Sequence, residues 1–381
     1  MFGVEVSRIA VNVLTTFGEF AKIAAHWNDR ISRWVPPNRA IFVTGEWLST
    51  WWKHFGHGKL HIVCVEHHDE PIAFAPLFIK RTHVLGSNIM SFIGTGISDY
   101  GEIAIKPGME RLAIITLMRH LASHCDLWDV IEMREISLAS KVPSLIRAWC
   151  EDEGWRYGIA CHLSVSEVCP VLNLPKSFER LLSSVRGNLR TSLKRRERQL
   201  RKLFDMQVGV VSDDNQLSEV IEVMFNLHAR RWRKRLQPGV FFLPSVQNFH
   251  REFARLALKN GWLAMHFMKL DGAYTAVHYC LRFDSATCYY GGGFAPEFGK
   301  HSIGTVLMGY AIKHAIESGA SVFDFLRGCE EYKLLWGAKP IPNASLRLFQ
   351  RRNVRSLATM ALLGMRDKLA LTAKCAAQRI G

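Results

Sequence analysis

Hydrophobic and polar positions follow the same order in two parts of the chain. In the first part, apolar and amphipathic stretches predict a hairpin, a strand, a helix and a strand at residues 60–66, 72–78, 89–93, 110–123 and 128–133. In the second part, a hairpin is predicted around Asp271-Gly272, a dipeptide typical of tight turns. The elements of this copy are predicted at residues 263–270, 274–283, 287–290, 302–318 and 322–326. The repeated order predicts an α/β (α+β) protein with two domains of similar topology.

Prolines separate the two copies. Pro170 and Pro175 lie in residues 166–176, a segment that follows neither a strand period nor a helix period. A chain of 381 residues is long enough for two hydrophobic cores. The last segment has the spacing of a basic amphipathic helix. The predicted parts of the chain are therefore residues 1–165, 166–350 and 351–381.

The composition agrees with a cytoplasmic globular protein. Hydrophobic residues make up 48% of the chain and charged residues 22%, as in ordinary soluble domains. Nine cysteines without regular spacing indicate reduced thiols rather than a disulfide framework. The first residues lack the basic start of a signal peptide. The longest apolar run, residues 357–365, is shorter than the roughly 20 residues that a membrane-spanning helix needs. We therefore expect no transmembrane helix.

The net charge of +15 is concentrated in three segments. Residues 186–202 contain eight Lys/Arg and one Glu, residues 230–235 contain five Lys/Arg, and residues 351–381 contain seven Lys/Arg and one Asp. Such surfaces suit an anionic cofactor, an acidic polymer, RNA or an anionic membrane face. Solvated helix faces without any partner would show the same pattern.

The predicted helix at residues 302–318 starts in a way that suits a phosphate. The first N–H groups of a helix and its positive dipole end favour anions. Ser302 is a good N-cap residue, Gly304 would let a phosphate approach the backbone, and Lys300 adds positive charge. A helix that merely packs against a sheet would also accept these residues.

The strand predicted at residues 322–326 ends beside several reactive side chains. Asp324 or Glu330 could act as a general base, and a partly buried carboxylate would have its pKa raised toward working pH. Tyr332 could return a proton to a leaving thiolate, and Lys333 could neutralise negative charge. The alternatives are a hydrogen-bonded turn for Asp324, core packing for Tyr332 and a surface cation at Lys333.

Other candidates lie outside this strand end. Asp99 and Tyr100, at the equivalent place in the first copy, could line a cleft or form a plain turn. Arg231 and Trp232 combine a cation with an indole, which suits an anionic or stacking ligand but also an ordinary helix surface. We expect no metal site, because the nearby histidines lack carboxylate or cysteine partners at ligand spacing; these histidines are His54, His57, His61, His67 and His68.

Together these residues resemble the CelD/BcsL-like acetyltransferases of the GNAT superfamily, which are related to the FemAB aminoacyltransferases. The most specific part of the resemblance is Asp324-Phe-Leu-Arg-Gly-Cys-Glu-Glu-Tyr-Lys333. The other matching segments are residues 45–52, 98–101, 186–190, 227–232, 270–272 and 302–305. Cys329 departs from the family pattern, where Asp is usual, and Glu331 departs where Pro is common. These departures favour Glu330 as the acid.

The resemblance implies two tandem GNAT-like domains, each a mixed, mostly antiparallel sheet flanked by helices. It implies an acyl-CoA site in the second domain, where Ser302, Ile303, Gly304 and Thr305 would bind the pyrophosphate and the preceding strand would pair with the pantetheine arm. The acceptor amine would attack the thioester directly. Asp324 or Glu330 would take its proton, and Lys333 would lie near the phosphate or the oxyanion.

Three functional hypotheses follow. The first is an acyl-CoA-dependent N-acyltransferase, without a metal, that modifies a small-molecule, saccharide or envelope-precursor acceptor in bacterial exopolysaccharide, cellulose or cell-envelope biosynthesis. The second is FemAB-like transfer from aminoacyl-tRNA, motivated by the basic residues 186–202. The third is a non-catalytic GNAT pair that docks on an anionic inner-membrane face or a polysaccharide synthase through residues 351–381.

Overall fold

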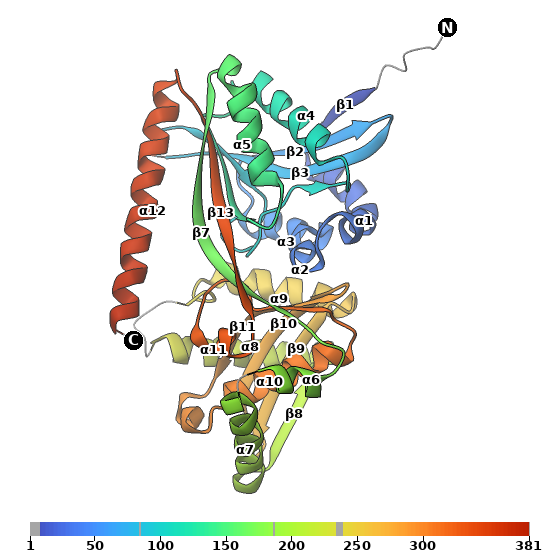
Figure 1. Ribbon diagram of the computed structural model, residues 1–381, viewed down its shortest axis with the longest axis vertical. Coiled ribbons are helices and arrows are strands. Elements are labelled where there is room, and N and C mark those ends of the chain that lie inside the picture. Colours follow the sequence, from blue (N-terminus) through green and yellow to red (C-terminus); the bar gives the residue numbers. More distant parts are fainter. Residues whose placement is uncertain (1–7, 84, 186, 234–238, 381) are drawn as a thin grey trace. The chain divides into compact units, whose positions relative to one another are not determined.

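The structure is a computed structural model that describes residues 8–83, 85–185, 187–233 and 239–380 (Figure 1). The chain divides into two compact units. The first unit comprises Met1–Trp52, Gly56–Glu167 and Pro342–Gly381. The second unit comprises Lys53–Phe55 and Val168–Ile341. The division thus falls after Glu167, inside the proline-containing segment that the sequence indicates.

Residues 342–350 belong to the first unit, whereas the sequence pattern placed them in the second domain. They form most of strand β13 (Lys339–Gln350), which pairs antiparallel with β6 (Val130–Ser137). Leu346 and Leu348 of β13 are buried in the hydrophobic core of the first unit. Alternation identifies a strand, but it does not identify the sheet that the strand joins, because that choice depends on a distant partner.

The first unit contains a mixed sheet in the order β1-β2-β3-β4-β6-β13-β7, with β5 beside β3. Its remaining strands are β1 (Ile9–Leu14), β2 (Lys59–His67), β3 (Glu70–Arg81), β4 (Asn88–Phe92), β5 (Ala104–Ile105) and β7 (Ile159–Asn173), which continues into the second unit. β4 and β6 pair in parallel, and β1–β2, β2–β3, β3–β4 and β6–β13 pair antiparallel. Its helices are α1 (Phe17–Trp34), α2 (Pro37–Ala40), α3 (Gly45–Phe55), α4 (Glu110–Ser123), α5 (Val142–Asp152) and α12 (Val354–Ile380), with short 3-10 segments η1 (Ile41–Val43) and η2 (Gly154–Tyr157).

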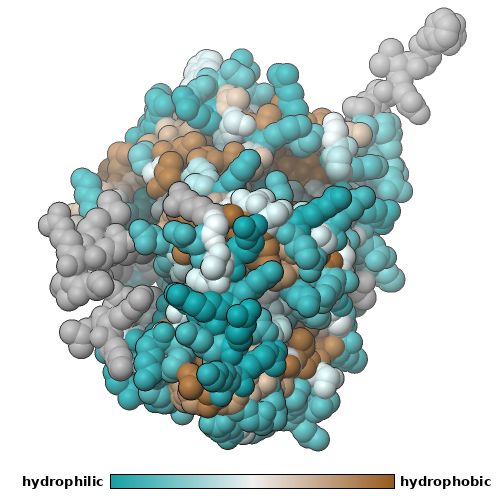
Figure 2. All heavy atoms as spheres, turned by 60° about the horizontal axis from the view of Figure 1, so that its bottom comes forward, coloured by the Kyte–Doolittle hydropathy of each residue, from teal (hydrophilic) through white to brown (hydrophobic). Residues whose placement is uncertain are grey.

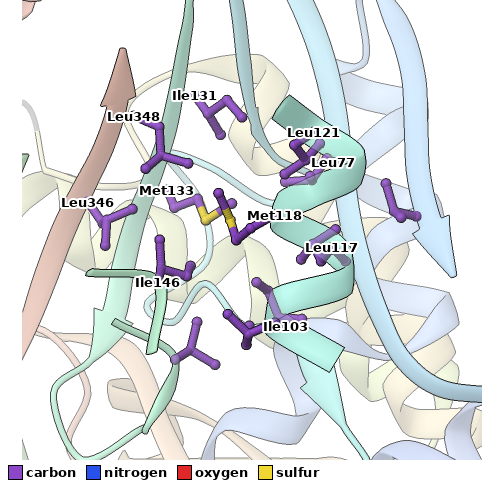
Figure 3. Packing of buried hydrophobic residues seen from close by; sticks show 14 of the residues in the cluster. Leu77, Ile103, Leu117, Met118, Leu121, Ile131, Met133, Ile146, Leu346 and Leu348 are labelled. Carbon is purple, nitrogen blue, oxygen red and sulfur yellow. The ribbon is translucent and has the colours of Figure 1, made fainter. Parts of the chain in front are cut away.

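Helices cover both faces of this sheet. Each strand contributes side chains to both faces, because successive residues of a strand point to opposite sides. On β3, Phe74 packs against Trp27 of α1 and Phe78 packs against Trp51 of α3. Leu77 lies in the cluster that includes α4 and α5. Each large apolar side chain buried in this way contributes about 1.5–3 kcal/mol. Figure 3 shows this cluster, with labelled side chains Leu77, Ile103, Leu117, Met118, Leu121, Ile131, Met133, Ile146, Leu346 and Leu348.

The predicted C-terminal helix is present as α12 and is attached to the first unit. The Ser356 hydroxyl donates a hydrogen bond of 2.6 Å to the Asp129 carbonyl. The Thr359 and Ser87 hydroxyls lie 2.6 Å apart. These contacts tie one side of α12 to the first unit, which leaves its other side exposed.

The second unit repeats the hairpin-strand-helix-strand order in a sheet β7-β12-β11-β10-β9-β8. Its strands are β8 (Met206–Val210), β9 (Leu263–Leu270), β10 (Ala273–Phe283), β11 (Ala286–Phe294) and β12 (Val322–Asp324). Its helices are α6 (Phe178–Ser184), α7 (Gly187–Leu203), α8 (Asp214–Arg233), α9 (Pro244–Lys259), α10 (Ile303–Glu317) and α11 (Glu331–Leu335), with the 3-10 segment η3 (Pro296–His301). The α/β class with helix-flanked mixed sheets is therefore confirmed.

Side-chain alternation also places helices on both faces of the second sheet. On β10, Ala276 and Cys280 are buried in the cluster that contains Leu307 of α10. Tyr279 of the same strand packs against His250 of α9, with ring centroids 5.6 Å apart. The residues on each face of β10 thus follow from the alternation of side-chain direction along a strand.

Among the described residues, no helix is long and apolar enough to cross a membrane. Figure 2 shows one face of the molecule, on which hydrophilic residues predominate and hydrophobic residues form separate small patches. The charge that the sequence concentrates in residues 187–202 lies on α7, at the end of the second unit that this view brings forward.

Candidate functional site

The candidate site lies where strands β11 and β12 separate. Their parallel ladder runs from Ala286↔Val322 to Cys288↔Asp324 and ends there with β12. The rest of β11, Tyr289–Phe294, stays paired with β10. A ligand site is expected where strands of a mixed sheet separate beyond their carboxyl ends.

Glycines at the end of β11 allow helix α8 to lie directly against the strand. A Cβ on Gly293 would come within 2.4 Å of the backbone nitrogen of His228. A Cβ on Gly292 would come within 2.5 Å of the Val277 carbonyl oxygen. No side chain fits at these distances, so Gly293 lets α8 pack against the strand, and Gly292 lies close to the neighbouring strand β10. It thereby places Arg231, near the end of α8, beside the end of β11.

Arg231 joins the strand end to the start of α10. Its guanidinium lies over the Phe294 ring, 5.1 Å from the centroid. A Cβ on Gly304 would lie 3.4 Å from the same ring. The cation from α8 and the glycine at the helix start therefore border one aromatic side chain, which brings together two candidates that lie far apart in the sequence.

Two phenols form the buried side of the site. The Tyr289 and Tyr332 phenols are close enough for each to affect the pKa of the other. Burial raises the pKa of both phenols, and the nearby Glu330 carboxylate raises them further, whereas Arg231 acts in the opposite direction. Both phenols therefore keep their protons at physiological pH and can donate hydrogen bonds.

Buried imidazoles next to the phenols are neutral. Burial lowers the pKa of His278 to about 3 and that of His228 to about 4, with a further lowering by Arg231. His278 packs edge-on against Tyr289, with centroids 5.0 Å apart. Tyr289, His278 and His228 were not predicted as site residues. The sequence signal that could have indicated them is a tyrosine or histidine within an otherwise apolar strand or helix face.

Lys333 is a buried cation with several partners. Its side chain is only 3% exposed, which excludes the surface-cation alternative. The ammonium donates to the carbonyls of Arg327 at 2.7 Å and Gly328 at 3.0 Å, and it pairs with Glu330 Oε2 at 2.9 Å. An ammonium has three donors, so these contacts favour a role in holding the loop between β12 and α11.

Glu330 presents a carboxylate that is 45% exposed. It precedes α11 in an extended conformation and folds back over Gly328, whose φ is +102°. This positive φ favours glycine, and a Cβ there would also lie 2.6 Å from Glu330 Oε2 and displace the carboxylate. Lys333 thus orients a carboxylate that remains open to a reactant.

Asp324 is fully buried at the end of β12. Its Oδ1 accepts a hydrogen bond of 2.8 Å from the Leu326 N–H, and Leu326 has a φ of +53°. This is the hydrogen-bonded turn that the sequence left open as an alternative, because the carboxylate stabilises the left-handed turn after the strand.

Ser302 does not act as the side-chain N-cap that the sequence predicts. It stands at the N-cap position of α10 with φ 54° and ψ 40°, and no side-chain capping hydrogen bond forms. An N-cap side chain normally requires extended backbone. Ser302 is instead the left-handed turn between η3 and α10, since its N–H donates to the Gly299 carbonyl at 3.0 Å.

The remaining residues at this helix start have different exposures. Ile303 is buried in the core of the second unit, so only its backbone can face a ligand. Gly304 and Thr305 are half-buried, and Lys300 is exposed. The first turn of α10 contains no acidic residue. The helix start therefore combines unsatisfied N–H groups with positive charge.

Asp99 and Tyr100 lie in the first unit and are buried there. The Asp99 carbonyl accepts a hydrogen bond of 3.0 Å from the Asn343 amide, and the Tyr100 ring packs against Phe42 with centroids 6.0 Å apart.

Trp232 lies in the second unit and packs against His228. Lys234 and Arg235 of the predicted basic segment, and Arg186, lie outside the described residues. In the part of the chain that the structure describes, no group of three or more His, Cys, Asp or Glu could hold a metal ion.

One known protein family matches part of the second unit. Residues 187–334 match the family described as the acetyltransferase (GNAT) domain. This segment contains α7 through most of α11, including the separation of β11 and β12. This segment of the second unit is thus similar to a GNAT acetyltransferase domain. No curated protein sequence matches the chain significantly.

Solved structures share the fold of the whole chain. FemX has a TM-score of 0.62 at 13% identity, covering 85% of this chain and 95% of its own. A tandem GNAT protein from the clavulanic acid biosynthesis pathway has a TM-score of 0.51 at 12% identity, covering 91% and 99%. The C-terminal domain of a putative lysylphosphatidylglycerol synthetase from Agrobacterium fabrum has a TM-score of 0.50 at 13% identity, covering 88% and 96%. The prediction of two GNAT-like domains is thereby confirmed.

Proposed function

We propose that this chain is an acyl-CoA-dependent N-acyltransferase whose site lies at the separation of β11 and β12. The observation that carries the proposal is that Arg231, Gly304 and the buried phenols meet there, next to the start of α10. The GNAT match to residues 187–334 supports acyl transfer as the reaction.

The residues at the start of α10 fit the diphosphate of CoA. The N–H groups of Ile303 and Gly304 belong to the first turn, which the helix does not satisfy internally. The half-buried glycine leaves room for close approach, and Thr305 and the exposed Lys300 can add a hydroxyl and a positive charge. Ser302 turns the chain so that these groups lie at the helix start. Tyr289–Phe294 of β11 would lie along the pantetheine arm.

The strand-end residues can perform the proton transfers of the reaction. As the acceptor amine attacks the thioester carbon, Glu330 takes the amine proton, directly or through water. Lys333 positions this carboxylate rather than contacting the reacting atoms. Tyr332, protonated because of its raised pKa and supported by Tyr289, donates to the leaving sulfur. Asp324 holds the turn on which Glu330 depends.

The acceptor in this proposal is an amine on a saccharide or envelope precursor, as the CelD/BcsL-like resemblance implies. Arg231 and Trp232 lie on the α8 side of the site and would contact an anionic or cyclic acceptor. Asp99 and Tyr100 have no role in this proposal, because both side chains are buried within the first unit.

Consumption of the thioester by a panel of acyl-CoAs tests the reaction. The full-length protein is mixed with each acyl-CoA and amino-sugar acceptors, and free thiol is measured. Amine-dependent thiol release supports the proposal. Release of an aminoacyl group from charged tRNA, without any use of acyl-CoA, would overturn it.

A second candidate is transfer from aminoacyl-tRNA, favoured by α7. Leu189, Leu193 and Leu200 of this helix are buried, whereas its opposite side is exposed and cationic. The exposed cations are Arg190, Lys194, Arg195, Arg198, Arg201 and Lys202. A tRNA bound by such a surface would lose affinity steeply with salt. The same release assay, run with charged tRNA as donor, distinguishes the two functions.

A third candidate is docking on an anionic inner-membrane face through α12. Exposed apolar residues repeat along this helix at Val354, Leu357, Leu362, Met365 and Leu369. Arg351, Arg352, Arg355 and Lys368 are also exposed nearby, so the surface is both apolar and basic. Co-sedimentation with phosphatidylglycerol vesicles, but not with phosphatidylcholine vesicles, would support this role. Loss of binding in Leu369→Glu would locate it on α12.

A further inference from the structure

A row of polar side chains crosses the face of the second sheet that α10 covers. It consists of His314 of α10, His266 of β9, His278 of β10 and Tyr289 of β11. The positions two residues away from the histidines on β9 and β10 lie on the same face, because side chains alternate along a strand. These positions belong to the apolar core; they are Ala264, Met268, Ala276 and Cys280. The row is therefore a line of titratable groups within a hydrophobic cluster.

Neighbouring members of the row contact or face one another. His314 Nδ1 lies 3.2 Å from His266 Nε2, which is a hydrogen bond between two imidazoles. His266 and His278 are register partners in the antiparallel β9–β10 pair, where opposed Cβ atoms lie about 4.5–5.5 Å apart. The His278 ring packs edge-on against Tyr289, with centroids 5.0 Å apart. The row thus leads from α10 across two strands to the candidate site.

Gly292 lets the last two members of the row approach each other. It is the register partner of His278 on β11. A Cβ on Gly292 would lie 2.9 Å from His278 Cδ2 and 3.0 Å from the Tyr289 hydroxyl oxygen. The imidazole and the phenol therefore border one small space, which only glycine leaves free.

The inner members of the row are buried, whereas its outer member reaches solvent. His266, His278 and Tyr289 are 1%, 4% and 7% exposed, and His314 is half-buried. Among the described residues, neither His266 Nδ1 nor His278 Nδ1 has a hydrogen-bond partner. A buried polar atom without a partner costs about 1–3 kcal/mol, and the apolar side chains on the same face avoid this cost. Core packing alone therefore does not account for the two imidazoles.

Burial keeps both inner imidazoles neutral at physiological pH. It is the main cause that lowers the pKa of His266 and that of His278 to about 3 each. The charged groups near the two ends of the row are Arg231 of α8, Arg282 of β10, Glu317 of α10 and Glu330. A neutral imidazole has one N–H donor and one acceptor nitrogen. Each ring can therefore take a proton at one nitrogen while it gives up a proton at the other.

We propose that this row is a proton relay, which carries protons from solvent at His314 to the phenols of the candidate site. The relay rests on the proposed function, in which Tyr332 gives its proton to the leaving sulfur. Tyr332 is then a partly buried phenolate near the Glu330 carboxylate, and it must regain a proton before the next turnover. Glu330 is 45% exposed and can release the proton of the amine to solvent. The relay returns a proton to the phenol by a separate route.

The relay moves one proton by successive transfers. The Tyr332 phenolate takes the hydroxyl proton of Tyr289, and Tyr289 takes the Nε2 proton of His278. His278 Nδ1 receives the Nδ1 proton of His266 through a bridging water, for which both nitrogens are available. His266 Nε2 takes the Nδ1 proton of His314, and His314 Nε2 takes a proton from solvent. One proton enters and one is delivered, each imidazole ends neutral in its other tautomer, and a flip of each ring restores the first tautomer.

Thiol release from acyl-CoA by the full-length protein, with a saturating amine acceptor, tests the outer end of the relay. His314→Ala should lower kcat on the order of tenfold, because the inner imidazoles lose their proton donor, while KM for acyl-CoA stays unchanged. Imidazole in the buffer should restore part of the rate, since this half-buried position opens to solvent. His162→Ala is the control: it removes an exposed imidazole from the first unit and should neither lower the rate nor respond to imidazole.

His266→Gln tests the inner part of the relay, because a carboxamide does not pass a proton by changing tautomer. The ratio of kcat in ordinary water to kcat in heavy water should become larger than in the wild type, since proton delivery then limits turnover. His250→Gln is the matched control, because His250 is also fully buried but lies on the α9 side of β10, against Tyr279. It should reduce stability by a similar amount and leave the isotope ratio unchanged.

The outcomes separate the relay from the proposed function. If the wild type releases no thiol from any acyl-CoA, the proposed function fails and the relay fails with it. If His314→Ala and His266→Gln turn over at the wild-type rate, acyl transfer stands and the phenols regain protons without the row, which overturns the relay alone. A lower rate that imidazole does not restore, with an unchanged isotope ratio, would also overturn the relay, because the row would then serve structure only.

Discussion

The two copies of the hairpin-strand-helix-strand order differ at the end of their parallel strands. In the first unit, the β4/β6 ladder ends at Ser91↔Glu132, but β6 continues to Ser137 alongside β13. In the second unit, β12 ends with its ladder at Asp324, and a loop that carries Glu330 follows. Both strands have an antiparallel strand on their other side, β13 beside β6 and β7 beside β12, but only β12 ends with its parallel ladder and is followed by a loop with side chains that can react.

The N-terminal ends of the equivalent helices in the two copies, α4 and α10, carry different charges. Helix α4 has Glu110 in its first turn, paired with Lys141 at 3.2 Å. Helix α10 has Gly304 at that end and no acidic residue in its first turn. A carboxylate already interacts with the positive helix end, which disfavours a phosphate there. The start of α10 therefore suits the proposed diphosphate site better than the start of α4 does.

The carboxylates near the two strand ends also have different surroundings. Glu132 of β6 is buried and pairs with Arg347 and Arg366, each at 2.7 Å. Glu330 has one cationic partner, Lys333, and remains 45% exposed. Fully paired buried carboxylates serve structure, while an accessible one can exchange protons. The two units thus share a topology, and under the proposed function the accessible carboxylate of Glu330 is what suits the second unit for proton transfer.

The largest expected effect is on catalysis by Glu330→Gln. Loss of a general base should lower kcat by about 10²- to 10⁴-fold, while CoA affinity stays unchanged because the carboxylate does not contact the diphosphate. Glu331→Gln is the matched control, since Glu331 is the exposed neighbour. Thiol release at saturating acyl-CoA measures both. A Glu330→Gln rate equal to the wild-type rate would remove Glu330 from the mechanism.

Arg347→Met should have the largest effect on the stability of the first unit. Breaking a buried ion pair typically costs about 3–5 kcal/mol, and Arg366 should retain part of the pairing of Glu132, so we expect about 3 kcal/mol. Chemical denaturation measures the change. Arg134→Met is the control, because Arg134 contacts Asp367 at 3.8 Å and is partly exposed. Equal effects of the two substitutions would refute the structural role of the Glu132–Arg347 pair.

Gly304→Glu should make the second helix start resemble the first. The new carboxylate at the start of α10 should weaken CoA binding by roughly 100-fold, about 2.7 kcal/mol, through repulsion and loss of space. The fold should tolerate it, since a Cβ meets the Phe294 ring at an ordinary 3.4 Å. Gly18→Glu places the same residue at the second position of helix α1, in open space, as the control. Titration calorimetry measures the affinity of each variant for CoA. If Gly304→Glu binds CoA with wild-type affinity, the diphosphate does not bind at the start of α10.

The smallest effect is expected for Lys333→Met. Removing the ammonium leaves the carbonyls of Arg327 and Gly328 without this donor, which should destabilise the protein by about 1–3 kcal/mol. The activity should fall as Glu330 loses its orientation, without a change in CoA affinity. Lys300→Met is the contrasting variant, because the exposed Lys300 should affect CoA affinity and not stability. If Lys333→Met instead lost CoA binding at unchanged stability, Lys333 would be the residue whose positive charge contacts the phosphate.

Much of the fold could be predicted from the sequence because it depends on local periods. The hairpin-strand-helix-strand order appears in both units near the predicted residues, with α4 at Glu110–Ser123 and α10 at Ile303–Glu317. The assignment of β13 to the first unit could not be predicted, since its pattern suits either sheet. Among the site residues, the approach of Arg231 to Phe294 and that of Tyr289 to Tyr332 join separate parts of the chain and could not be predicted either.

The sequence by itself determined the two repeated sets of elements, the basic character of α7 and the acid-rich strand end around Glu330. These depend on residue order and side-chain chemistry within a few turns or strand residues. Only the tertiary structure decided that Lys333 is buried in a loop, that Ser302 turns the chain instead of capping it, and that Arg231 lies over the Phe294 ring. Burial, backbone conformation and contact between distant residues set these outcomes, and no local pattern contains that information.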